Sequence, residues 1–114
     1  MSADWRPRLW RAVFVVTVLT ILVLALAPMP PSPRSVPYAD KVQHAFAFFV
    51  LWVMGARTGW WRKLPLAGML LGLGALIEVA QGLTGYREAS LPDLAADALG
   101  VALGWGLVAV KPAT

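Results

Sequence analysis

Apolar residues gather in four stretches, separated by short polar or proline-rich segments. The stretches run over about 10–27, 42–57, 64–83 and 91–110. Each is close to the roughly 20 residues that an α-helix needs to cross a bilayer, although the second is a little short. Short segments join the last three, so we expect these neighbours to run antiparallel. The pattern predicts an all-α membrane protein with four transmembrane helices in one antiparallel bundle, forming a single domain over 1–114.

Composition supports this prediction and removes several function classes. Hydrophobic residues make up 59% of the 114 positions and charged residues 14%, with a mean hydropathy of +0.66. Soluble domains carry about 25% charged residues. Cysteine is absent, which excludes disulfides, a thiolate nucleophile and a cysteine-based metal site. The net charge is +4, but no basic run with interleaved aromatic residues indicates nucleic-acid binding.

The basic residues are distributed unevenly between the two ends of the predicted bundle. One end holds Arg6, Arg8, Arg11, Arg57, Arg62, Lys63 and Lys111. The other end holds Arg34, Lys41 and Arg87. Because cytoplasmic loops carry the excess of Lys and Arg, we expect both termini in the cytoplasm. The chain is therefore predicted to be a multi-pass protein of the plasma (cytoplasmic or inner) membrane.

The first stretch has a second interpretation. Three arginines, an apolar run and the small residues Ala25 and Ala27 resemble a secretory signal peptide with its cleavage site. Pro28 directly after this site would hinder cleavage. Cleaved or retained, the stretch leaves the orientation of the remaining three unchanged, so both interpretations stay open.

Polar residues are concentrated where three of the stretches approach the outer side. They are Lys41, His44, Glu78, Gln81, Arg87, Asp93 and Asp97. In an antiparallel bundle these positions fall at similar depth. Three pairs are spaced by three or four residues, which places the two members of each pair on one helix face. The pairs are Lys41 with His44, Glu78 with Gln81, and Asp93 with Asp97. Polar groups kept within apolar segments usually face the bundle interior. We therefore predict that these seven residues form a ligand-binding cluster.

Small residues continue the acidic stripe of the last stretch. Gly100 and Gly104 follow Asp97 at helical spacing, and Gly68 and Gly72 give the third stretch a similar pattern. Such stripes allow membrane helices to approach closely. The pattern predicts three helices in close contact and permits a homo-oligomer.

Each polar residue also has a simpler interpretation. Lys41 can extend to the membrane interface, and Asp93 can stabilise the start of a helix. His44, Glu78 and Asp97 are harder to explain this way, because an unpaired carboxylate within an apolar span is costly. These three are the candidate catalytic residues should the chain be an enzyme. No nucleophile motif is present. A metal held by His44, Glu78 and an aspartate is an alternative, but a single histidine without cysteine weighs against a tight zinc site, so we expect no metal and no cofactor.

Three blocks in order resemble the VanZ-like family of small bacterial membrane proteins. The first is Asp40-Lys41-x-x-His44-x-x-x-Phe48, the second is Glu78-x-x-Gln81, and the third is Arg87 followed by Asp93-x-x-x-Asp97-x-x-Gly100. The resemblance covers roughly 40–104 and implies a cell-envelope protein, with a link to teicoplanin resistance through the family's founding member. The family usually has Asn where this chain has Asp97. Asp97 lacks the amide donor and adds a charge, so a role that needs that donor is in doubt.

Three functions remain open at this point. The first is an envelope protein that lies in the lipid bilayer and whose cluster binds or modulates a lipid-linked intermediate or a glycopeptide. The second is an intramembrane hydrolase or transferase on a lipid-linked substrate, with His44 as general base. The third is a structural or interaction role, in which the cluster only holds the helices together.

Overall fold

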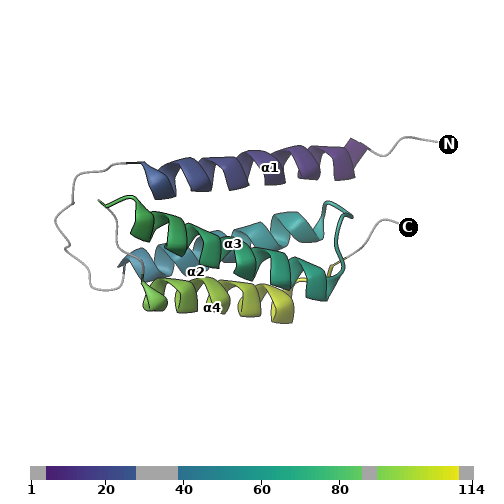
Figure 1. Cartoon of the computed structure of the whole chain (residues 1–114). Coiled ribbons are helices and arrows are strands. Elements are labelled where there is room, and N and C mark those ends of the chain that lie inside the picture. The colour runs from purple at the N-terminus through teal and green to yellow at the C-terminus, as the bar shows by residue number, and fades with distance from the viewer. Residues whose placement is uncertain (1–4, 28–38, 86–89, 111–114) are drawn as a thin grey trace.

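The structure is a computed structural model of the 114-residue chain. It describes the backbone of residues 5–27, 39–85 and 90–110, and the side chains of all of these except 39 and 40. The elements are α1 (Trp5–Leu26), α2 (Ala39–Ala56), α3 (Lys63–Leu83) and α4 (Leu91–Leu107). These four helices run roughly antiparallel to their neighbours (Figure 1), and the described ranges contain no strand. The predicted all-α fold of four helices is confirmed.

The helices α2 and α4 make the most extensive contact, and α3 packs against both of them. The helix α1 lies along α2 and α3 on one side of this group (Figure 1). The centre is filled by Leu51, Trp52, Leu66 and Leu70, which have no exposed surface. The core thus belongs mainly to α2, α3 and α4, and α1 contributes Phe14 to it.

The helix boundaries differ from the predicted ones at both ends of the chain. The first helix begins at Trp5, because Pro7 is tolerated in a first turn where no intrahelical donor is required. The last helix ends at Leu107 rather than at 110, so that part of the prediction was wrong. The backbone of Val108 is extended, with φ −128° and ψ 115°, and its carbonyl accepts a hydrogen bond of 3.0 Å from the indole Nε1 of Trp52. A tertiary partner therefore satisfies the carbonyl where the helix stops.

Close helix contact at two of the predicted glycines is confirmed. A Cβ atom added to Gly100 would lie 2.2 Å from the carbonyl oxygen of Ala45. One added to Gly104 would lie 2.3 Å from the ring of Trp52. Only glycine at these two positions lets α4 approach α2 so closely, and this approach brings the two helix faces that carry the polar residues together.

No neighbouring helix in the described part of the chain covers the other two glycines, Gly68 and Gly72. A Cβ atom at Gly68 or Gly72 would meet no atom within 4 Å, so both lie on an open face of α3. The packed glycine of this helix is Gly74, where an added Cβ would lie 2.9 Å from the Oδ2 atom of Asp97. Helical spacing of small residues identifies a stripe, but the neighbours decide which glycines another helix covers.

Two of the helices, α1 and α3, are long and apolar enough to cross a membrane by length and composition. The helix α1 has 22 residues and buries Phe14, while Val16, Leu19 and Val23 are exposed. The helices α2 and α4 are shorter, with 18 and 17 residues. This apolar character suggests association with a membrane.

Basic and aromatic side chains meet at the end of the bundle that holds the first turn of α1 and the last turn of α2. The Arg11 Nε atom donates to the Thr58 carbonyl at 2.7 Å. Three cation–π pairs lie at this end: Arg11 over Trp60 at 5.4 Å, Arg57 over Trp10 at 5.2 Å, and Lys63 over Trp105 at 4.7 Å. This basic, aromatic end lies opposite the end that gathers the carboxylates.

Candidate functional site

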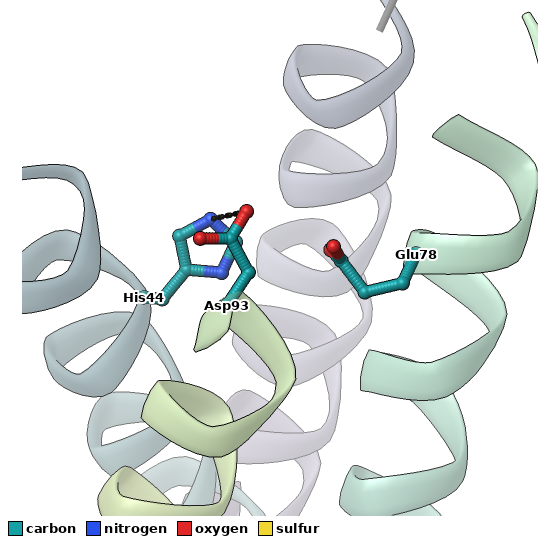
Figure 2. Close-up of side chains that lie close together, drawn as sticks. All are labelled: His44, Glu78 and Asp93. Carbon is teal, nitrogen blue, oxygen red and sulfur yellow. Dashed lines mark ion pairs between the residues drawn. The ribbon is translucent and has the colours of Figure 1, made fainter. Parts of the chain in front are cut away.

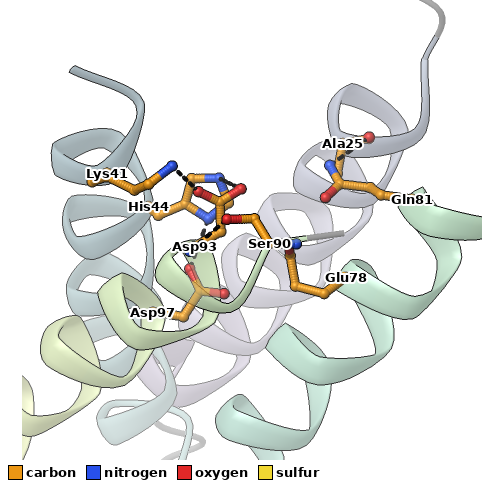
Figure 3. Close-up of polar contacts among 8 residues, drawn as sticks. All are labelled: Ala25, Lys41, His44, Glu78, Gln81, Ser90, Asp93 and Asp97. Carbon is orange, nitrogen blue, oxygen red and sulfur yellow. Dashed lines mark hydrogen bonds and ion pairs between the residues drawn. The ribbon is translucent and has the colours of Figure 1, made fainter. Parts of the chain in front are cut away.

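Five of the predicted site residues converge at the other end of the bundle (Figure 3). Lys41 and His44 come from the first turns of α2, Glu78 from the last turns of α3, and Asp93 and Asp97 from the first turns of α4. We call these five side chains the polar cluster. The antiparallel arrangement brings them together although the sequence separates them by up to 56 positions.

His44 is held by a buried carboxylate. Its Nδ1 atom lies 2.9 Å from Asp97 Oδ1, and Asp97 is 1% exposed. The second oxygen of this carboxylate, Oδ2, lies over Gly74 and has no hydrogen-bond partner among the described residues. The absence of a side chain at Gly74 makes room for Asp97. This contact fixes the orientation of the imidazole ring and leaves its Nε2 atom facing the rest of the cluster.

Asp93 lies between the lysine and the histidine. Its Oδ1 atom accepts a hydrogen bond of 2.5 Å from Lys41 Nζ. Its Oδ2 atom lies 3.7 Å from His44 Nε2, which is too long for a hydrogen bond. Asp93 therefore compensates the charge of Lys41 through one oxygen and presents the other to His44.

Glu78 reaches the polar cluster from α3. The backbone N–H of Ser90 donates to its Oε1 atom at 2.8 Å, while Oε2 has no hydrogen-bond partner among the described residues. The residue is 6% exposed. Figure 2 shows the Glu78 carboxylate directed towards His44 and Asp93. A buried carboxylate oxygen without a partner costs free energy of folding, so packing of apolar side chains alone does not explain this orientation.

Ser90 was missed in the sequence. Its hydroxyl accepts from the backbone N–H of Asp93 at 3.2 Å and caps α4, and its own N–H holds Glu78. The segment Ser90-Leu91-Pro92-Asp93 matches the S-x-x-D pattern of a helix start, with proline in the first turn. That pattern was the available indication.

Two predicted residues differ from the rest. The Gln81 side chain donates from Nε2 to the Ala25 carbonyl at 2.9 Å, so it connects α3 to the end of α1 rather than to His44 (Figure 3). Arg87 lies outside the described residues. The contact gives Gln81 a structural role, and ligand binding by Gln81 and by Arg87 stays a prediction.

The charges of the polar cluster favour a cationic or hydrogen-bond-donating ligand group. Three carboxylates face Lys41 and His44, and the lysine is already paired with Asp93. Because Lys41 is paired with Asp93, it is poorly placed to bind a phosphate or carboxylate group of a ligand. The same contacts also join α2 to α4 and α3 to the start of α4, so the cluster stabilises the bundle whatever it binds.

No family model, no curated protein and no solved structure matches this sequence. The resemblance to the VanZ-like family therefore rests on the three blocks of residues alone. Function has to be argued from the geometry of the polar cluster and from the distribution of apolar and charged surface.

Proposed function

We propose that this chain is a four-span membrane protein of the cell envelope, related to the VanZ-like family, whose polar cluster binds a polar group of an envelope component. One observation carries the proposal. Three apolar helices bring His44, Glu78 and Asp97 together at one end, and both carboxylates keep a buried oxygen without a partner among the described residues. Polar groups retained at such cost usually serve binding or chemistry.

The outer surface supports insertion of the whole bundle into a bilayer. Large apolar side chains are exposed on all four helices, including Leu19 on α1, Phe46 on α2, Leu76 on α3 and Leu103 on α4. A soluble monomer rarely exposes so many large apolar side chains on every helix. Lipid satisfies such a surface, and α2 and α4 then cross the bilayer together with α1 and α3, although they are shorter.

The two ends of the bundle support an orientation with the polar cluster outside the cytoplasm. The opposite end carries Arg11, Arg57 and Lys63 stacked on tryptophans. Tryptophan gathers at membrane interfaces, and Lys and Arg gather on the cytoplasmic side. The cluster then faces the compartment that contains cell-wall intermediates and glycopeptides. Its excess of carboxylates suits an ammonium or amide group of such a ligand.

The orientation is tested with single cysteines, since the native chain has none. Leu91→Cys lies at the cluster end of α4 and Arg62→Cys at the basic end of α3, and both positions are exposed. In intact cells, a membrane-impermeant thiol reagent should label the first and not the second. The reverse labelling would place the cluster in the cytoplasm and exclude an outer envelope ligand.

Ligand binding is tested by the phenotype of the cluster in a glycopeptide-sensitive host. Expression of the wild-type chain should change the teicoplanin concentration that inhibits growth, and His44→Ala should remove the change. Gln43→Ala, an exposed neighbour on α2, is the matched control. If His44→Ala and Gln43→Ala reach the membrane at equal levels and give the same inhibitory concentration, the cluster has no role in this phenotype.

A second function is favoured by the contact between His44 and Asp97. A histidine held at Nδ1 by a buried carboxylate, with Nε2 directed into a polar cluster, is arranged as a general base. A hydrolase or transferase acting on a lipid-linked substrate would use His44 to take a proton from the attacking hydroxyl. Release of product from a labelled lipid-linked substrate by purified protein, lost in His44→Gln, is the measurement that distinguishes this enzyme from a binding protein.

A further inference from the structure

The polar cluster contains the donor atoms of a metal site. One donor atom from each of His44, Glu78 and Asp93 lies within 4.8 Å of the others (Figure 2). Metal–ligand bonds to nitrogen and oxygen are about 2.0 to 2.2 Å, so bound donors lie about 3 to 4 Å apart. The three side chains would need to close by roughly 1 Å to hold an ion.

Each of these three residues is fixed through one polar atom and leaves another available. Asp97 holds His44 at Nδ1, at 2.9 Å. Lys41 holds Asp93 at Oδ1, at 2.5 Å. The third contact is the backbone N–H of Ser90, which holds Glu78 at Oε1 at 2.8 Å (Figure 3). The remaining atoms are His44 Nε2, Asp93 Oδ2 and Glu78 Oε2.

This arrangement matches the way proteins support metal ligands. A metal-binding histidine almost always gives its other ring nitrogen to a carboxylate or carbonyl, and ligating carboxylates are themselves hydrogen-bonded. Here His44 has Asp97 in that position, and the carboxylate of Asp97 is 1% exposed. A structural network would be expected to satisfy its own buried atoms, whereas Glu78 Oε2 has no partner among the described residues.

We infer that His44, Glu78 and Asp93 bind one divalent cation, with Asp97 as the positioning residue of the histidine. One imidazole and two carboxylates form a mixed nitrogen–oxygen set, which suits Mn²⁺, Fe²⁺ or Zn²⁺ better than Mg²⁺ or Ca²⁺. The ion compensates the excess of negative charge. Three protein donors leave coordination positions open to a water molecule or to an oxygen of a ligand.

This inference requires only the helix bundle and does not rest on the proposed envelope function. The sequence alone led us to expect no metal, because one histidine and no cysteine give a poor zinc site. The tertiary structure changes that expectation by bringing the carboxylates of Glu78 and Asp93 to His44 and placing a third carboxylate, that of Asp97, behind the ring.

The test is metal binding by the purified full-length chain in detergent. The protein carries an affinity tag without histidine, is treated with a chelator, and is titrated with MnCl₂ or ZnCl₂. We expect saturable binding of one ion per chain by calorimetry, with a changed electron paramagnetic resonance spectrum for Mn²⁺. A wild-type protein that is helical by circular dichroism but binds neither ion at one per chain overturns the inference.

Variants then identify the ligands. Glu78→Gln and Asp93→Asn keep side-chain size and should abolish measurable binding, as should His44→Gln, while the control Gln43→Ala should bind like the wild type. Asp97→Ala should weaken binding by about 10- to 100-fold, and Asp97→Asn, which keeps an acceptor for Nδ1, should weaken it less. Unchanged affinity in helical Glu78→Gln and Asp93→Asn would contradict the assignment, whatever their envelope phenotype.

Discussion

Gly100 is the position at which the approach of α4 to α2 can be tested most directly. An added Cβ atom would lie 2.2 Å from the carbonyl oxygen of Ala45 and 3.0 Å from the amide nitrogen of Phe49. Real Cβ atoms essentially never approach other atoms closer than 3.0 Å. Because the obstacle is backbone rather than a flexible side chain, Gly100→Ala must separate the two helices by about 0.8 Å.

Forcing extra volume into a packed interface costs typically about 1 to 3 kcal/mol, and a backbone obstacle places this variant near the upper value. We expect Gly100→Ala to lower the midpoint of thermal unfolding by about 10 °C, a shift of the size that about 3 kcal/mol gives in a domain of this length. The separation would also carry the contact between His44 and Asp97 beyond hydrogen-bonding range, since it starts at 2.9 Å.

The assay is thermal unfolding of purified protein in detergent, followed by far-ultraviolet circular dichroism. Gly106→Ala on the same helix and Gly72→Ala on α3 are the matched controls, because a Cβ atom there meets nothing within 4 Å. Both controls should unfold at or slightly above the wild-type temperature, since alanine is favoured over glycine within helices. If Gly100→Ala unfolds with the controls, the close packing of α2 and α4 is refuted.

Three further substitutions test single contacts by the same thermal assay. Ser90→Ala removes the cap on the Asp93 amide and should cost about 1 kcal/mol, whereas Ser90→Asn should restore most of it; equal stability of all three would contradict the cap. Trp52→Phe loses the bond to the Val108 carbonyl and should cost about 1 to 3 kcal/mol, and an unchanged midpoint would show that this bond does not stabilise the end of α4. Thr58→Val replaces a fully buried hydroxyl that bonds at both its donor and acceptor sides and should cost about 1 to 3 kcal/mol, while Thr58→Ser should retain most of the stability.

The sequence by itself determined the four helices and the end at which the polar residues meet. In a bilayer, a single apolar run of about 20 residues can satisfy its own backbone hydrogen bonds only as a helix, and short connections make neighbouring helices antiparallel. Once this topology is given, His44, Glu78 and Asp97 must lie at similar depth. The spacing of Asp97 and Gly100 on one face likewise follows from the 3.6-residue period alone.

Only the tertiary structure decided which partner each polar atom takes. Gln81 carries the same spacing to Glu78 as His44 does to Lys41, yet it turns to the Ala25 carbonyl because α1 lies beside α3 there. Gly72 is open and Gly74 is covered by Asp97, although both belong to the same glycine-rich helix.

Contacts between helices also determine what happens at the end of α4 and which carboxylate oxygen of Glu78 could bind a metal ion. The helix stops at Leu107, and the indole of Trp52, 56 residues earlier, donates to the Val108 carbonyl just beyond that end. The Ser90 amide binds Glu78 Oε1, and Oε2 has no hydrogen-bond partner within the described part of the chain. Helical period and hydropathy act within one segment, whereas these pairings depend on distances between helices, which no local pattern of residues encodes.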